Sequence, residues 1–225
     1  MAQANIHVGV LRSVPLFAML SQAQLTALAS TMARRSAPKN RTILKVGDLT
    51  DSLYIIIAGR CKVQMSDNEG KEVILAVLGP GDFFGEMGLL DDAPRAASVV
   101  TIEPCEFLTL GKDAFNALLK DNFEMAMVIM RGLVKRLREA DRKIESLALL
   151  DVYGRVARVL LESSELGADG RRVVKGKLPR QDIAKMIGAS REMVSRVMKG
   201  LEIEGFIEVD AGGAIVLRER LSAAL

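Results

Sequence analysis

The spacing of hydrophobic positions divides the chain into three regions. Between about residues 41 and 110, short apolar runs alternate with polar turns rich in glycine, a pattern typical of a β-sandwich or β-barrel. From Lys112 to about residue 150 the apolar residues recur at helical spacing. Beyond residue 151, shorter helical patterns precede two strand-like runs. We therefore expect an α+β protein with domains at 1–120, 121–150 and 151–225.

The first region is predicted to contain a helix followed by six strands. Ser21 and Gln24 form an S-x-x-Q capping box ahead of apolar residues at helical spacing, which predicts a helix over 16–35. The strands are predicted at 42–46, 52–57, 61–65, 72–78, 97–102 and 106–110. The polar turn at 68–70 predicts a β-hairpin between the third and fourth strands.

The second region is predicted to be one long helix with an apolar seam. Seven apolar residues alternate in steps of four and three, the a/d pattern of a coiled coil: Ala126, Met130, Leu133, Leu137, Ala140, Ile144 and Leu147. A helix of about 28 residues is about 42 Å long, which is long for a surface helix. We expect this seam to pair with a second copy in a homodimer. A helix lying on its own β domain is the alternative.

The third region predicts a winged helix-turn-helix. Helices are expected at 152–164, 179–187 and 190–204, with a loop at 167–170. Gly188 interrupts the helical pattern between the last two helices, and Ser190 can cap the second of them. Strand-like runs at 206–209 and 214–217 are expected to form a hairpin. Two helices joined by a tight turn and followed by a hairpin are typical of this motif.

The last helix is predicted to have one charged side and one apolar side. The side chains expected to be exposed are Arg191, Glu192, Ser195, Arg196 and Lys199. Those expected to face the core are Met193, Val194, Val197, Met198 and Leu201. In a DNA major groove, arginine pairs with guanine and glutamate with cytosine, and Lys199 would reach phosphate. The alternative is a bundle helix whose charges are only solvated.

Charge is concentrated near that helix. The whole chain has a formal net charge of +3, whereas residues 171–200 contain nine Lys or Arg and two acidic residues, a local net of +7. A basic cluster of this kind favours a polyanionic partner. A solvated surface with spare lysines is the alternative.

The segment 85–98 combines residues suited to a cyclic phosphodiester. Gly85 permits close approach of the backbone to a ligand. Glu86 can accept hydrogen bonds from a sugar hydroxyl. Arg95 offers a fork of donors to a phosphate. The alternative is a structural Glu86–Arg95 ion pair with no ligand.

Several function classes are not expected. Cys61 and Cys105 lie far apart in apolar stretches and predict buried thiols in a reduced compartment, too few for an iron–sulfur cluster. His7 is the only histidine, so a histidine metal site, haem or a Ser–His–Asp triad is not expected. No nucleophile, base or metal cluster accompanies 85–98, so we expect no enzyme and no cofactor. No apolar run reaches about 18 residues, which predicts a cytoplasmic protein without membrane contact.

The motifs at 85–98 and 180–196, with the linker at 147–155, resemble the Crp/Fnr superfamily of transcription regulators over about residues 11–216. The resemblance implies a cyclic-nucleotide-binding β-roll (a double-stranded β-helix), a long central dimerisation helix and a C-terminal winged helix-turn-helix. It also implies binding to double-stranded DNA. A contact with RNA polymerase stays open.

The resemblance further implies roles for single residues. Glu86 would bind the ribose 2′-hydroxyl and Arg95 the cyclic phosphate. Further ligand contacts would come from Gly85, Met87, Ala96 and Ala97. On the DNA side, Arg191, Glu192 and Arg196 would read a half-site with a TGTGA-like core. Arg180 would grip phosphate. The other residues expected to contact DNA are Ser190, Ser195, which lies near the base edges, and Lys199.

The base of the nucleotide stays open. Ala140 and Asp141 stand where catabolite activators of this superfamily have a Thr-Ser pair that contacts adenine across the dimer. An ionised Asp141 accepts hydrogen bonds, so it suits the adenine amino group or a guanine edge. Cyclic AMP is the first choice and cyclic di-GMP the rival. A regulator of the same architecture that responds to no nucleotide is the further alternative.

Overall fold

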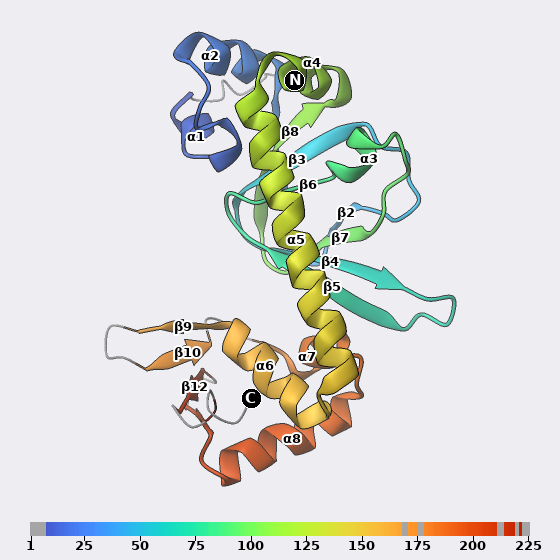
Figure 1. The fold of residues 1–225 in the computed structure, drawn as a ribbon, viewed down its shortest axis with the longest axis vertical. Coiled ribbons are helices and arrows are strands. Elements are labelled where there is room, and N and C mark those ends of the chain that lie inside the picture. Colours follow the sequence, from blue (N-terminus) through green and yellow to red (C-terminus); the bar gives the residue numbers. More distant parts are fainter. Residues whose placement is uncertain (1–7, 168–170, 175–177, 211–213, 219–220, 222–225) are drawn as a thin grey trace. The chain divides into compact units, whose positions relative to one another are not determined.

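The computed structural model describes residues 8–167, 171–174, 178–210, 214–218 and 221 of the 225-residue chain. The fold is α+β, and the chain divides into two compact units, Met1–Leu137 and Arg138–Leu225 (Figure 1). Hydrophobic clusters lie within each unit, so each has a core of its own.

Two four-stranded antiparallel sheets form the centre of the first unit, in the orders β1-β8-β3-β6 and β2-β7-β4-β5. The strands are β1 (Ala33–Ala37), β2 (Thr42–Leu44), β3 (Ser52–Ala58), β4 (Cys61–Ser66), β5 (Glu72–Leu78), β6 (Phe83–Phe84), β7 (Ser98–Thr101) and β8 (Cys105–Gly111). All six predicted strands and the hairpin between β4 and β5 are confirmed. The strands β1 and β6 are additional to the prediction.

The alternation of residues along β3 explains how this unit packs. Leu53 and Ile55 belong to a core shared with helices, whereas Tyr54 and Ile56 belong to a core between the two sheets. Successive residues of a strand point to opposite faces. A strand buried on both faces therefore appears in the sequence as a continuous apolar run.

Helices cover the outer face of the sheet that contains β3. They are α1 (Val8–Arg12), the 3-10 helix η1 (Pro15–Phe17), α2 (Gln22–Thr31), α4 (Lys112–Asp121) and the first turns of α5 (Phe123–Leu149). The predicted capping box is confirmed: the Gln24 N–H donates to Ser21 Oγ at 3.3 Å, and the Ser21 N–H donates to Gln24 Oε1 at 2.9 Å. The predicted helix limits at 16–35 are wrong. Met32 is extended, and the following residues pair with β8 as β1.

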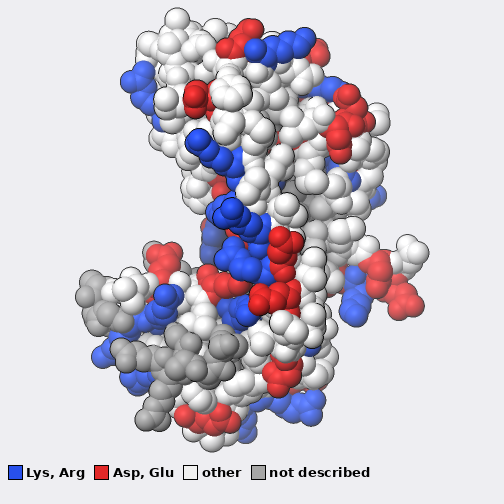
Figure 2. All heavy atoms as spheres, viewed as in Figure 1, with Lys and Arg blue, Asp and Glu red and all other residues white. Residues whose placement is uncertain are grey.

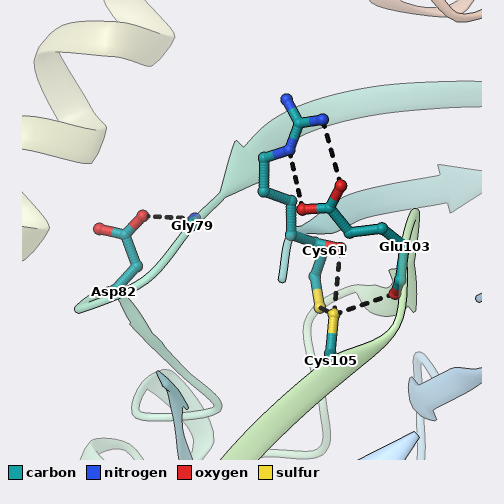
Figure 3. Close-up of polar contacts among 6 residues, drawn as sticks. Cys61, Gly79, Asp82, Glu103 and Cys105 are labelled. Atoms are coloured by element: carbon teal, nitrogen blue, oxygen red, sulfur yellow. Dashed lines mark hydrogen bonds and ion pairs between the residues drawn. The ribbon is translucent and has the colours of Figure 1, made fainter. Parts of the chain in front are cut away.

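Both cysteines are buried free thiols, as predicted, and they face each other between β4 and β8 (Figure 3). Their sulfur atoms are 3.8 Å apart, and the Cys105 thiol donates to the carbonyl of Glu103 at 3.2 Å. Burial raises the pKa of both thiols. Nearby, Arg60 pairs with Glu103 at 3.1 Å. The cysteines therefore act as small core residues next to a surface ion pair.

The second unit contains the predicted helix-turn-helix. Its helices are α6 (Val152–Glu162), α7 (Arg180–Ile187) and α8 (Arg191–Ile203), besides the last turns of α5. Val156, Leu160, Ile183, Val194 and Leu201 form the centre of its core. Asp151 caps α6 by accepting from the Gly154 N–H at 2.8 Å.

A four-stranded sheet of order β11-β12-β10-β9 completes this unit. Its strands are β9 (Ser164–Leu166), β10 (Arg172–Val174), β11 (Ile207–Val209) and β12 (Ile215–Leu217). The predicted hairpin is confirmed as β11 and β12, and its turn at 211–213 lies outside the described residues. The sequence did not indicate β9 and β10, which pair across the predicted loop; residues 168–170 of that loop also lie outside the described part.

Within the described residues, every helix is too short or too polar to cross a membrane. The same residues hold no group of three or more His, Cys, Asp or Glu arranged to bind a metal ion.

Candidate functional site

The segment after β6 places two of the predicted ligand-binding residues close together. Gly85 connects β6 to the short helix α3 (Met87–Leu90) with a φ of 87°. A Cβ atom at this position would lie 2.5 Å from Arg95 Nη1 and 3.1 Å from the carbonyl oxygen of Ser52. Both the backbone conformation and the close approach of the Arg95 side chain therefore require glycine.

Three hydrogen bonds hold the buried guanidinium of Arg95. Its Nη1 donates to the Gly85 carbonyl at 2.9 Å, and its Nη2 donates to the Ser52 carbonyl at 2.8 Å and to Asp51 Oδ1 at 3.1 Å. A guanidinium has five N–H donors. The protein thus fixes the plane of this group and leaves two donors for a further acceptor.

Glu86 is buried, with only 1% of its surface exposed. Its Oε1 accepts from Arg136, while Oε2 has no hydrogen-bond partner in the described part of the chain. Burial raises the pKa of Glu86, and the nearby Arg136 charge opposes that rise. A buried acceptor without a donor is costly. Oε2 is therefore a position where a hydroxyl donor from a ligand would be stabilising.

Glu86 and Arg95 are not partners of each other in an ion pair. Glu86 pairs with Arg136, and Arg95 pairs with Asp51. The alternative of a structural Glu86–Arg95 pair is therefore wrong, because each side chain has its own partner from a distant part of the sequence.

Arg136, on α5, completes this cluster, and sequence reasoning did not include it among the ligand-site residues. Besides Glu86, it donates to the Phe83 carbonyl, and its guanidinium carbon lies 5.3 Å from the centroid of the Phe83 ring. Gly132 lies one turn earlier, and a Cβ there would come within 3.0 Å of that ring. The sequence did show a glycine, Gly132, followed four residues later by Arg136. It gave no sign that Arg136 pairs with Glu86, which lies fifty residues away.

The remaining residues predicted to bind the ligand lie at two places. Met87 and Ala96 are exposed next to Glu86 and Arg95, and Ala97 is half-buried. Asp141 is exposed on α5, within the second contact unit. Met87, Ala96 and Ala97 are therefore sequence neighbours of the buried Glu86 and Arg95, whereas Asp141 belongs to the other unit.

The predicted dimer seam along α5 is partly exposed. Leu137 and Ile144 are 63% and 64% exposed, and Met130, Ala140 and Leu147 are also exposed. Leu133 instead packs partly against the core of the first unit. Figure 2 shows basic and acidic side chains side by side along the course of α5. The helix therefore presents exposed apolar residues among charges, as the seam prediction requires.

In the second unit, α7 and α8 are joined by a tight turn. Gly188 ends α7 in the left-handed conformation with a φ of 65°. Ser190 then caps α8, because its Oγ accepts from the Met193 N–H at 3.1 Å. The predicted break and cap are thus confirmed, and they fix where the first turn of α8 begins.

The basic residues predicted to contact DNA are exposed. Arg180, Arg191, Arg196 and Lys199 have no hydrogen bond or ion pair to the described residues, and Ser190 is exposed while Ser195 is half-buried. The pKa of the exposed Glu192 is lowered by backbone and Ser190 hydrogen bonds at the start of α8. Glu192 is therefore ionised and can only accept hydrogen bonds.

One residue of α8 is not where the sequence predicted it. Val194, Met198 and Leu201 are buried and Val197 packs at the edge of the core, but Met193 is 37% exposed and is not part of that core. The buried residues are spaced by four and three along the helix, and Met193 lies outside that row. The prediction that Met193 faces inward is wrong.

Comparisons with known proteins agree with both parts of this arrangement. Residues 34–122 match the family described as cyclic nucleotide-binding domain, and residues 154–223 match the Crp-like helix-turn-helix domain. The cAMP-activated global transcriptional regulator Vfr of Pseudomonas aeruginosa is 35% identical over 87% of this chain and 94% of its own. The cyclic AMP receptor protein of Thermus thermophilus is 34% identical over 90% and 92%.

Solved structures lead to the same conclusion about the fold. The structure of the c-di-GMP responsive global regulator CLP of Xanthomonas campestris is similar with a TM-score of 0.73, at 29% identity over 84% of this chain and 94% of that one. The matched domains follow one another in the order that the sequence predicted. The chain therefore belongs to the Crp/Fnr family of DNA-binding transcription regulators, carries a cyclic nucleotide-binding domain, and is not an enzyme.

Proposed function

We propose that this regulator is a homodimer whose binding to specific DNA sequences is controlled by a cyclic nucleotide, with cyclic AMP as the favoured effector. The observation that carries the proposal is the state of the Glu86 carboxylate. One oxygen accepts from Arg136 on α5, and the other is buried and has no hydrogen-bond partner among the described residues. A ligand hydroxyl at the second oxygen would thus act on a group already bonded to the long helix.

Two groups divide the recognition of the sugar and the phosphate. Glu86 Oε2 accepts from the ribose 2′-hydroxyl, and the two remaining donors of Arg95 bind the cyclic phosphate. Gly85, Met87, Ala96 and Ala97 line this position. The residues fit the ligand because an unpaired acceptor and unused donors lie on the same short segment.

The effector acts by shifting a population between two arrangements of the dimer. In the arrangement that binds DNA, the two copies of α8 lie about 34 Å apart, one turn of the double helix. Arg191, Glu192 and Arg196 then read bases, while Arg180, Ser190, Ser195 and Lys199 contact phosphates or flanking positions. The exposure of these arginines, which make no hydrogen bond or ion pair to the described residues, supports this role.

The base is recognised from α5. Asp141 follows Arg136 by five residues, which is about 140° around an ideal helix. This angle supports a carboxylate that reaches the base from the second copy. Cyclic AMP fits because its amino group donates to Asp141. Cyclic di-GMP is the second candidate, since the CLP regulator is named as responsive to it.

Isothermal titration calorimetry with cyclic AMP, cyclic GMP and cyclic di-GMP tests the effector. We expect heat of binding with cyclic AMP, a large loss of affinity in Glu86→Ala, and tighter DNA binding in the presence of the bound nucleotide. Heat with cyclic di-GMP alone would favour the second candidate. No heat with any of the three, with DNA binding intact, would leave a regulator of this architecture that needs no nucleotide.

The homodimer is tested at one of the two most exposed residues of the seam. Leu137→Lys places a charge in the row that contains Met130, Ala140, Ile144 and Leu147. Light scattering should give a dimer mass for the wild type and a monomer mass for this variant. Lys135→Leu, on the same helix but outside the seam, serves as the control that keeps the dimer. An unchanged mass for Leu137→Lys would refute the seam.

A further inference from the structure

Met193 is an apolar residue in the first turn of α8 that is not part of the core of its unit. Other apolar residues around the helix-turn-helix, such as Met186 and Val197, pack at the edge of the core, whereas Met193 does not. With 37% of its surface exposed, it lies among Glu192, Arg196 and the other polar residues that α8 presents outward. Exposed apolar residues are common on protein surfaces, and what distinguishes Met193 from Ile203 at the other end of the same helix is its place in the first turn.

The position of Met193 on α8 indicates which kind of partner could contact its side chain. It lies in the first turn of the helix, where its backbone N–H donates to Ser190 Oγ at 3.1 Å. Arg196 follows three residues later and so lies on the neighbouring part of the same surface. The N-terminal residues of a recognition helix are those that meet base edges. Met193 would therefore enter the major groove together with Glu192 and Arg196.

The chemistry of the groove leaves one partner for this side chain. The base edges of the major groove present hydrogen-bond donors and acceptors and one apolar group, the C5-methyl of thymine. A thioether is only a weak acceptor, so methionine gains little from phosphates or polar base atoms. Its flexible chain adapts well to a small apolar surface.

We propose that Met193 contacts the C5-methyl of a thymine in each operator half-site and so determines specificity at that position. This inference rests on the proposed function, because it requires α8 to lie in the major groove. It adds an apolar contact to the polar ones made by Arg191, Glu192 and Arg196. The half-site should then contain at least one thymine that is selected for its methyl group alone.

The test compares thymine with uracil, which lacks only that methyl group. An operator is first selected from a random duplex library with the full-length protein and cyclic AMP. Each thymine of the half-site is then replaced singly by uracil, and the affinity is measured by fluorescence anisotropy. For the wild type we expect one position at which the replacement weakens binding by about four-fold, the loss typical of one buried methyl group.

Two variants make the comparison specific. Met193→Ala should bind the thymine and uracil duplexes equally at that position. Ile203→Ala changes the exposed apolar residue that ends the same helix and should keep the full four-fold difference. Since both side chains are exposed, both variants should unfold at the wild-type temperature.

The outcomes separate the inference from the function on which it rests. A uracil scan without any sensitive position, or an undiminished four-fold difference in Met193→Ala, would overturn the role of Met193 while DNA binding stands. An equal loss of affinity by Met193→Ala on all duplexes would also overturn it, because it would show a sequence-independent contact. A library without any enriched sequence would instead contradict the proposed function.

Discussion

The candidate ligand site and the recognition helix use their charged side chains in opposite ways. Glu86 and Arg95 are buried and bonded within the protein, whereas Arg191 and Arg196 are exposed and make no hydrogen bond or ion pair to the described residues. The charged side chains of the ligand site thus contribute to the packing of the fold, while the arginines of α8 lie on its surface and do not. Substitutions at the first site should affect stability and ligand binding together, whereas those of the two α8 arginines should affect only DNA binding.

The largest effect should come from Arg95→Ala. The substitution removes the donor to the carbonyls of Gly85 and Ser52, two half-buried residues, and each unsatisfied group costs about 1–3 kcal/mol. We expect the free energy of unfolding to fall by about 2–5 kcal/mol in urea titrations without nucleotide. Arg191→Ala is the matched control and should change it by less than about 0.5 kcal/mol. Equal stability of the two variants would remove the distinction between the sites.

The second prediction concerns α8 alone. Arg191→Ala and Arg196→Ala should each weaken binding to the selected operator by about 1–3 kcal/mol and relax its specificity, because they remove contacts to base edges. Lys199→Ala should weaken binding to all duplexes alike and lower the slope of log affinity against log salt by about one. Anisotropy titrations at several salt concentrations measure both. Equal losses on operator and random DNA for the arginine variants would contradict base readout.

The same contrast explains what the sequence could predict. The helix-turn-helix follows from local signals: the period of apolar residues, the break at Gly188 and the cap at Ser190. Even here, assigning every apolar residue to the core misplaced Met193. The four-and-three spacing of Val194, Met198 and Leu201 already defined the buried face of the helix, and Met193 does not fit that spacing.

The ligand site was predictable in its residue types but not in its connections. Arg136 lies fifty residues from Glu86, and Asp51 lies 44 residues from Arg95. These contacts depend on the register of β3 with β6 and on the close approach of α5 to Phe83. Sheet registers and helix packing distances are properties of the whole domain. The sequence therefore indicated Glu86 and Arg95 and did not indicate their partners.

Two glycines with positive φ give a third comparison. At Gly188 an added Cβ meets nothing within 4 Å, so Gly188→Ala costs only the left-handed backbone, about 1–2 kcal/mol. At Gly85 the Cβ also collides with Arg95, which adds about 1–3 kcal/mol. In thermal unfolding, Gly85→Ala should therefore have a lower melting temperature than Gly188→Ala. The reverse order would mean that the Arg95 side chain moves away at little cost.

The smallest effect is a difference in pH dependence between two glutamates. Burial raises the pKa of Glu86, so the folded state binds this proton more tightly than the unfolded state does. The stability from this group is present below the ordinary pKa of about 4.5 and is lost as the pH rises through the folded value. Glu86→Gln, which cannot ionise, should therefore gain stability relative to the wild type above pH 4.5, by at most about 1.4 kcal/mol per pH unit.

Glu192 should show the opposite sign. Its pKa is lowered by hydrogen bonds at the start of α8, so the ionised form stabilises the fold. That contribution is present above the ordinary pKa and is lost as the pH falls through the lowered one. Glu192→Gln should thus be less stable than the wild type at neutral pH, and the difference should vanish in acid. Urea titrations between pH 3 and 8 measure both trends, and trends of the same sign would show that burial does not distinguish the two carboxylates.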